Sequence, residues 1–201
     1  MKKNKNNSNM KYQIENGTCI IPVGTKAIEK EAFMNCTELR HVVIPDTVTE
    51  IGQSAFYGCS NLEDIRLPKS VTKIGPDAFA FCSSLTHIEV DEENKLFDSR
   101  DNSNAVIRKK NNTLLIGCSN TRIPQSVTNI GMSAFVGCTN LAHLDIPSSV
   151  NSIGSWAFFG CSQLEKLNMA HKVAMGLGVF EGTKKQLNEI EERVLLQLKR
   201  A

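Results

Sequence analysis

The sequence predicts a solenoid, in which the short strands of successive coils stack side by side. The first observation is a repeated frame, (I/L)-P-x-x-(V/A)-x-x-I-(G/E)-x-x-A-F-x-x-C-x-x-L-x-x-(I/V/L), which starts at Ile21, Ile44, Leu67, Ile123 and Ile146. The second is its spacing, because the starts lie 23 residues apart except for one interval of 33 residues from Val90 to Ile123. A fixed period of this length is the signature of stacked repeats that share one core.

Composition excludes several classes of function. The 201 residues are 41% hydrophobic and 22% charged, as in ordinary globular domains, and the net charge of +2 gives no electrostatic basis for binding nucleic acid. No apolar run approaches the roughly 20 residues of a membrane helix, so we expect no membrane insertion. The first ten residues are basic and polar, with no apolar stretch after them. They do not form a complete signal peptide, which predicts either a cytoplasmic protein or an export signal outside this sequence.

The chain divides into three predicted parts. Residues 1–17 are expected to be a lead-in or a capping segment. Residues 18–182 are expected to form the solenoid, with about six to seven coils. Its first coil is imperfect, with Glu29 where later coils have glycine, as is usual where a solenoid ends. Residues 183–201 are expected to form a C-terminal amphipathic helix.

Each repeat predicts its own local structure. In the coil that ends at Leu67, the spacing of Leu62, Ile65 and Leu67 favours a short strand with alternate side chains buried. Proline follows directly, which suits the end of a strand because proline has no N–H to donate. The V-x-x-I-G segment then predicts a second short extended piece with glycine at a turn. The A-F-x-x-C segment predicts a single helical turn that buries alanine, phenylalanine and cysteine.

Two columns of identical side chains follow from this stacking. The phenylalanine column is predicted at Phe33, Phe56, Phe79, Phe135 and Phe158, and the cysteine column at Cys36, Cys59, Cys82, Cys138 and Cys161. Five cysteines cannot pair off completely, and no compact C-x-x-C cluster offers a zinc site. We therefore expect buried structural thiols, no metal and no cofactor.

The long interval, residues 90–122, predicts one enlarged coil. Its polar opening is followed by two short strands, 105–108 and 113–117, on either side of Lys109–Asn112. This pattern is typical of a hairpin. Because the frame resumes in register at Ile123, we interpret the segment as an enlarged coil and not as a domain boundary.

The C-terminus predicts a degraded last coil and then a helix. Val179–Thr183 resembles the A-F-x-x-C segment, and Thr183 begins a capping-box pattern. Apolar residues follow at helical spacing, at Leu187, Ile190, Val194 and Leu198. We expect this helix to cap the open end of the solenoid, and the alternative is a dimerisation or docking helix. The oligomeric state is unknown from the sequence, and a monomer is the expectation.

The repeated frame resembles the BspA-like, or treponemal-type, leucine-rich repeats over residues 18–182. The segments Asp98–Ile107 and Gly117–Pro124 resemble a variant coil of that family. The resemblance implies a leucine-rich-repeat solenoid with a strand-lined concave face. The repeat pattern itself adds short strands and single helical turns on the other sides, and the C-terminal pattern adds a capping helix. It also implies a bacterial protein of a cell-surface or secreted family involved in adhesion or host-protein binding. The family has no catalytic residues.

The variable positions of the long strands are the candidate site, because specificity resides in variable residues on a fixed frame. These positions are expected to point outward from the concave face: His41, Val43, Asp64, Arg66, His87, Glu89, His143, Asp145, Lys166 and Asn168. Their mixture of charge, histidine and amide predicts a non-enzymatic scaffold that binds a partner protein.

Two alternatives to protein binding stay open at this point. The first is a metal- or glycan-binding surface module, since His41, Asp64 and His87 lie at one position of three neighbouring strands. Imidazole and carboxylate suit zinc, but a tetrahedral site lacks a clear fourth ligand here. The second is a hydrolase, which is disfavoured because the frame places no nucleophile beside these groups and a strand face has no closed pocket.

Overall fold

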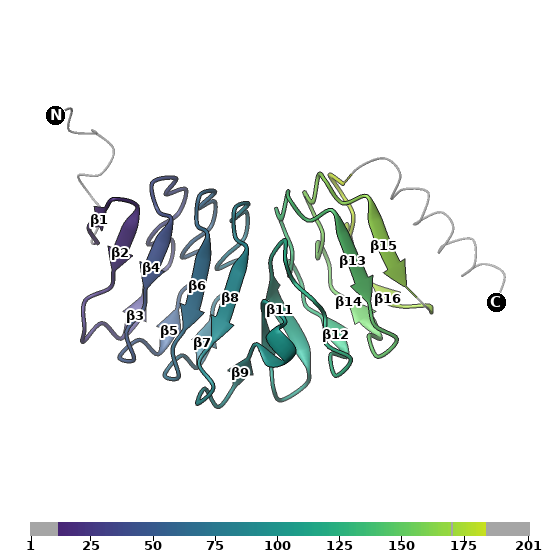
Figure 1. Cartoon of the computed structure of the whole chain (residues 1–201), viewed down its shortest axis with the longest axis horizontal. Coiled ribbons are helices and arrows are strands. Elements are labelled where there is room, and N and C mark those ends of the chain that lie inside the picture. The colour runs from purple at the N-terminus through teal and green to yellow at the C-terminus, as the bar shows by residue number, and fades with distance from the viewer. Residues whose placement is uncertain (1–11, 170, 184–201) are drawn as a thin grey trace.

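The computed structural model describes residues 12–169 and 171–183, and these residues form a stack of coils in which each coil lies on the one before it (Figure 1). Most coils contribute one longer strand and one two-residue strand, with turns between them. The longer strands are β2 (Thr18–Ile20), β4 (His41–Val43), β6 (Asp64–Leu67), β8 (His87–Val90), β13 (His143–Ile146) and β15 (Lys166–Met169). The two-residue strands are β3 (Ala27–Ile28), β5 (Glu50–Ile51), β7 (Lys73–Ile74), β12 (Asn129–Ile130), β14 (Ser152–Ile153) and β16 (Ala174–Met175).

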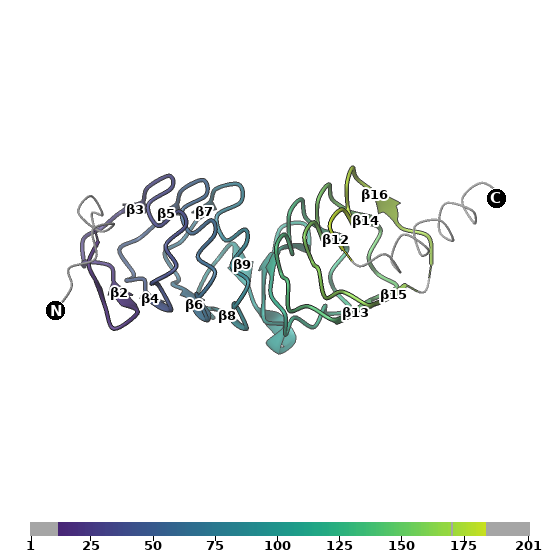
Figure 2. The ribbon, with the colours of Figure 1, turned by 90° about the horizontal axis from the view of Figure 1, so that it is seen from above.

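Neighbouring coils are joined by parallel strand pairs one repeat apart. Asp64 pairs with His41 in the coil before and with His87 in the coil after. The two strand rows lie on different sides of the molecule, and Figure 2 shows them from above. We call the side that carries the longer strands the long-strand face.

The A-F-x-x-C segments are consecutive turns and not the predicted helical turns. Tyr57 N–H donates to Ser54 at 3.1 Å and Cys59 N–H donates to Phe56 at 3.1 Å, both across three residues. Other N–H groups of the segment bond to the next coil instead, as Phe56 does to Ala78 at 2.8 Å. A continuing helix would need those donors for itself. The prediction was wrong because bonding between coils takes the backbone groups that a helix requires.

The phenylalanine column is buried, as predicted, and its rings stack. Centroids lie 5.0 Å apart between Phe33 and Phe56 and 4.9 Å apart between Phe56 and Phe79. Beyond a break in the middle, Phe158 stacks on Phe135 at 5.1 Å. The stacks extend past the predicted columns to Tyr12 at one end and Phe180 at the other.

The cysteine column is also buried and all its thiols are free, as predicted. The thiol of Cys59 donates to the carbonyl of Phe33 at 3.0 Å, and that of Cys161 donates to Phe135 at 3.1 Å. Burial raises the pKa of Cys59 from the ordinary 9.0 to about 12, with a further contribution from Cys36. These thiols are neutral hydrogen-bond donors, since burial disfavours the thiolate.

Glycine follows most short strands because the coils approach closely there. A Cβ atom on Gly52 would lie 2.5 Å from the backbone nitrogen of Lys30, and one on Gly75 would lie 2.4 Å from that of Gln53. The expectation of a glycine turn was therefore right about the place but not about the cause. The side chain is excluded by the preceding coil.

The enlarged coil interrupts the stack. It contains β9 (Phe97–Asp98), the 310 turn η1 (Arg100–Asn102), and the predicted hairpin of β10 (Ala105–Arg108) and β11 (Thr113–Gly117). On the short-strand side β11 pairs with β12, so that row continues into the next coil. On the long-strand face β8 ends one sheet, while β13 and β15 form a separate two-stranded sheet. The buried apolar residues likewise form two clusters that meet in this coil.

The two ends differ in what the structure describes. β1 (Ile14–Glu15) folds back on β2 as an antiparallel hairpin, which covers the outer edge of the first long strand. At the other end Val179 and Phe180 are buried and complete the degraded last coil. The C-terminal helix predicted for residues 183–201 lies, except for Thr183, outside the described residues.

Candidate interaction surface

All ten predicted site residues lie on the long-strand face, and none is buried. His41 and Asp64 are half-buried, and the other eight are exposed. Their inward neighbours on the same strands, such as Val42, Ile65 and Ile88, are buried. The alternation follows from the two-residue period of a strand.

The enlarged coil divides these residues into two groups. One group lies on β4, β6 and β8, and the other lies on β13 and β15. Figure 2 shows that the coil projects from the long-strand face between the two groups. The sequence frame treats all ten as one series, but the structure brings together only the members within each group.

Charged pairs between neighbouring coils characterise the first group. Arg66 bonds to Glu89 at 3.1 Å and to Asp91 at 3.2 Å. His41 Nδ1 lies 2.5 Å from a carboxylate oxygen of Asp64. Such pairs keep their charged atoms at the surface, where a partner protein can form ion pairs and hydrogen bonds with the same atoms.

The column His41, Asp64 and His87 does not converge on a point. The Asp64 carboxylate contacts His41 on the strand before it, while the side chain of His87, on the strand after it, is exposed. Among the described residues no group of three or more histidine, cysteine, aspartate or glutamate side chains is arranged to hold a metal ion. A structural zinc site would need four such ligands at about 2.0–2.3 Å.

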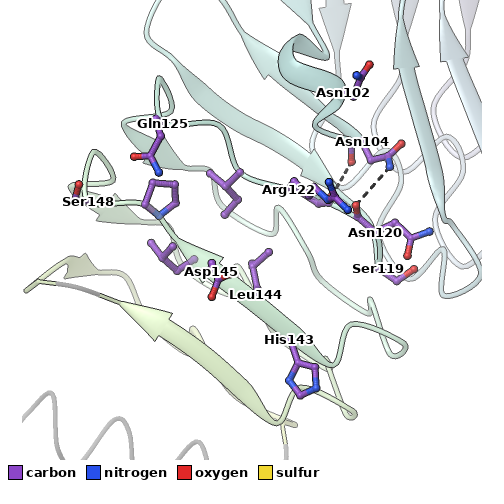
Figure 3. A pocket seen from close by; sticks show the side chains of 14 residues that line it. Asn102, Asn104, Ser119, Asn120, Arg122, Gln125, His143, Leu144, Asp145 and Ser148 are labelled. Carbon is purple, nitrogen blue, oxygen red and sulfur yellow. Dashed lines mark hydrogen bonds between the residues drawn. The ribbon is translucent and has the colours of Figure 1, made fainter.

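The second group is less charged in its contacts. Asn168 donates to Asp145 at 2.5 Å, while His143 and Lys166 lie opposite each other two pairs earlier on β13 and β15. A groove of about 1070 Å³ lies against β13 on the side of the enlarged coil. Figure 3 shows the polar side chains of Asn102, Asn104 and Arg122 on the wall opposite β13.

Sequence reasoning missed an aromatic cluster on the turn side of the molecule. Phe81 lies 5.2 Å from Tyr57 and 6.3 Å from Phe159 between ring centroids, and Trp156 is 44% exposed beside them. These residues occupy variable positions of the turn segment. The sequence did contain a signal for this cluster, namely aromatic residues outside the repeated frame. Phe81 lies beside the coil after the enlarged one, because its N–H donates to the carbonyl of Val136.

The chain belongs to the BspA type leucine rich repeat family. It matches the BspA type leucine rich repeat region in six copies, over residues 6–114 and 114–194. The fold and the frame described above are those of this family, whose members are in general protein-interaction scaffolds. No helix formed by the described residues is long and apolar enough to cross a membrane.

Solved bacterial proteins share the fold. A leucine rich cell surface protein from Faecalibacterium prausnitzii is 33% identical, with a TM-score of 0.65 over 76% of this chain and 41% of that one. The pneumococcal vaccine antigen PcpA is 25% identical, with a TM-score of 0.66 over 76% of this chain and 39% of that one. The chain thus spans about two fifths of each of these proteins. No curated protein matches it.

Proposed function

We propose that this chain is a non-enzymatic scaffold that binds a partner protein through its long-strand face at the bacterial cell surface. The observation that supports the proposal is the alternation of buried, constant residues with exposed, variable residues along each long strand. Alternate residues are buried and nearly invariant in type, and the residues between them are exposed and change from coil to coil. Variable side chains on a rigid frame are a common design for specific recognition.

The surface chemistry agrees with a protein partner. Arginine, histidine, aspartate, glutamate and asparagine alternate over neighbouring coils, which offers both donors and acceptors for a polar interface. The cell-surface description of the F. prausnitzii relative supports the proposed location. The C-terminal helix remains part of the proposal as a cap on the last coil, and a monomer is the expected state.

The test is a double substitution on each of two faces. Arg66→Ser with Glu89→Ser removes an ion pair between coils on the long-strand face, where the two atoms lie 3.1 Å apart. Lys73→Ser with Glu50→Ser removes a matched pair at 2.7 Å on the short-strand row. Immobilised variants are compared for the proteins that they capture, and the affinity of each captured protein is then measured after purification.

We expect the first variant to bind the captured protein at least about tenfold more weakly, a loss near 1.4 kcal/mol. The second variant should bind it as the unmodified chain does. The opposite result would assign binding to the short-strand side and contradict the proposal. Both variants should keep their melting temperature within a few degrees, since exposed substitutions change stability by about 0.5 kcal/mol or less.

A second candidate is glycan binding, which the aromatic cluster favours. Tyr57, Phe81, Phe159 and Trp156 border a hollow of about 320 Å³ beside Asp77. Exposed aromatic faces can stack on sugar rings while a carboxylate accepts hydrogen bonds from hydroxyl groups. Trp156→Ala should abolish retention on a glycan array if this site binds sugars, and it should leave protein capture by the long-strand face intact.

A further inference from the structure

The strand β13 has one edge that pairs with no strand of the described residues. On β4, β8 and β15 the first residue of the strand donates its N–H to the coil before it. His41 donates to Gly17 at 3.0 Å, His87 to Glu63 at 3.3 Å and Lys166 to Ala142 at 3.2 Å. Each partner lies 24 residues back, so the same register would send the N–H of His143 to Ser119.

That bond is not made, because the segment before β13 is held on the opposite wall. Ser119 N–H donates back to Leu85 at 3.4 Å. The Thr121 hydroxyl donates to the carbonyl of Asn104 at 2.6 Å, and Arg122 N–H donates to Ser103 at 2.9 Å. The groove lies where a neighbouring strand would otherwise run, as Figure 3 shows.

The open edge presents backbone groups in strand geometry. On β4 the carbonyl of Val43 accepts a hydrogen bond from the N–H of Ile21, in the coil before, at 3.0 Å. Asp145 is the equivalent of Val43, and no described residue donates to its carbonyl from the groove side. A residue's N–H and C=O lie on the same side of an extended strand, so His143 and Asp145 both direct backbone groups into the groove.

The opposite edge of the interruption is closed. The N–H of Val90 on β8 donates to the Ser99 hydroxyl at 3.1 Å, and that of Ile88 lies 3.4 Å from the Asn104 side-chain oxygen. Side-chain acceptors thus replace a neighbouring strand at β8. No equivalent side chain occupies the edge of β13 in the described part of the chain, so of the two strand edges at the interruption the one on β13 is open to an added strand.

We propose that the groove binds an extended segment of another polypeptide, which adds to β13 as a strand and directs a carboxylate to Arg122. Four residues of β13 extend about 13 Å at 3.3 Å per residue, so a segment of about five residues fits. Main-chain bonds to His143 and Asp145 supply the affinity that is independent of sequence. The inference goes beyond the face proposal, because it uses the backbone of β13 and not the outward side chains.

The charge of Arg122 at the groove favours an added strand that carries an acidic side chain. Arg40, Arg66 and Arg100 each contact a carboxylate at 2.8–3.2 Å. Arg122 is exposed at the groove and forms no ion pair with any described residue. Asp145 occupies the position of Arg122 one coil later, but its carboxylate accepts from Asn168 and does not pair with Arg122. An acidic side chain on the added strand therefore meets an available guanidinium, while a small apolar one next to it covers the half-buried Ile123.

The probe is a dye-labelled peptide of sequence Thr-Val-Glu-Val-Thr, acetylated and amidated at its ends, with binding followed by fluorescence anisotropy. We expect the full chain to bind it saturably with a Kd below about 1 mM. A peptide methylated on alternate backbone nitrogens should bind at least about tenfold more weakly, because it cannot complete the strand ladder. A peptide with glutamine for glutamate should also bind more weakly.

Substitutions in the chain assign the edge. Asp145→Pro removes the N–H that faces the groove and should weaken the parent peptide at least about tenfold, while Asp145→Asn keeps that N–H and most of the affinity. Arg122→Gln should remove the preference for glutamate. Arg66→Ser with Glu89→Ser should leave peptide binding unchanged whatever the fate of the long-strand partner.

Three results would overturn the inference. The first is an absence of binding by the full chain, and the second is equal binding of the parent and the methylated peptide. The third is self-association of the full chain that Asp145→Pro abolishes, because a second copy would then be the occupant of the edge.

Discussion

The coils before and after the enlarged coil share one frame but differ in how their surfaces are joined. Before it, charged side chains link neighbouring coils, as in Arg40 with Glu63 at 2.8 Å and Lys69 with Glu93 at 2.5 Å. After it, amide and hydroxyl groups do so, as in Ser152 with Asn129 at 2.7 Å. A stack of buried phenylalanines lies beneath each of the two surfaces.

This difference separates stability from surface chemistry. Exposed ion pairs contribute about 0–1 kcal/mol each, whereas truncation of a buried phenylalanine costs about 3–5 kcal/mol. The surface can therefore change from one half to the other without loss of the fold. The apolar clusters of the two halves meet only in the enlarged coil, so each half is stabilised largely by its own core.

The largest expected effects come from the phenylalanine stacks. Phe56→Ala and Phe158→Ala should each destabilise their own half by about 3–5 kcal/mol, since both rings are fully buried between two others. Trp156 is the single tryptophan, so its fluorescence follows the C-terminal half while far-ultraviolet circular dichroism follows both. We expect Phe158→Ala to lower the denaturation midpoint seen by fluorescence more than Phe56→Ala does. Coincident transitions by both probes in both variants would show one cooperative unit.

A buried amide in the enlarged coil should have the next largest effect. Asn94 is 1% exposed, donates to Pro68 and Val71 at 3.0 Å each, and accepts from Leu96 and Phe97 at 2.9 Å. Asn94→Ala leaves these groups unpaired and should lower the free energy of unfolding by about 1–3 kcal/mol.

The control for Asn94 is an exposed amide. Asn61 makes one bond, to Thr37 at 2.8 Å, and Asn61→Ala should change the free energy of unfolding by about 0.5 kcal/mol or less. Equal effects of the two substitutions in urea denaturation would mean that burial of Asn94 does not stabilise the junction between the halves.

Alkaline pH should weaken both halves through their thiols. Burial raises the folded-state pKa of Cys59 and of Cys161 from 9.0 to about 12. A raised pKa contributes stability that is complete below pH 9 and is lost as the pH rises toward 12, because only the unfolded chain ionises in that interval. Each thiol should contribute up to about 1.4 kcal/mol per pH unit to the slope. Cys59→Ala should reduce the slope measured between pH 8 and pH 11, and an unchanged slope would assign it to other groups.

The smallest expected effect concerns salt. Raising the ionic strength from about 0.1 M to about 1 M shortens the screening length from roughly 10 Å to 3 Å. The charged contacts of the first half should weaken, with a total change of about 1 kcal/mol or less. Fluorescence of Trp156 should report little change. If salt shifts the denaturation midpoint measured by fluorescence more than the midpoint measured by circular dichroism, charged contacts contribute more to the stability of the C-terminal half than to that of the first half.

The sequence predicted the regular parts of this fold because each repeat encodes them locally. The spacing of Leu62, Ile65 and Leu67 fits β6, and the predicted hairpin has the bounds of β10 and β11. The direction of the segment 118–122 was not predictable, because contacts with Leu85, Ser103 and Asn104 determine it. For the same reason the candidate residues could be assigned to a face, but not divided into two groups.

The close approach at Gly52 and Gly75 has a consequence for how such a chain can change its length. Each of these positions has no room for a side chain, because it lies directly against the backbone of the preceding coil. A residue inserted between a short strand and its glycine would move that glycine out of this place, whereas the addition or loss of a whole 23-residue unit would not. The enlarged coil accommodates its ten additional residues within one interval, and the next coil resumes the frame at Ile123. The molecule can thus change its length by whole repeats, or by an insertion within one coil that leaves the spacing of the neighbouring coils unchanged.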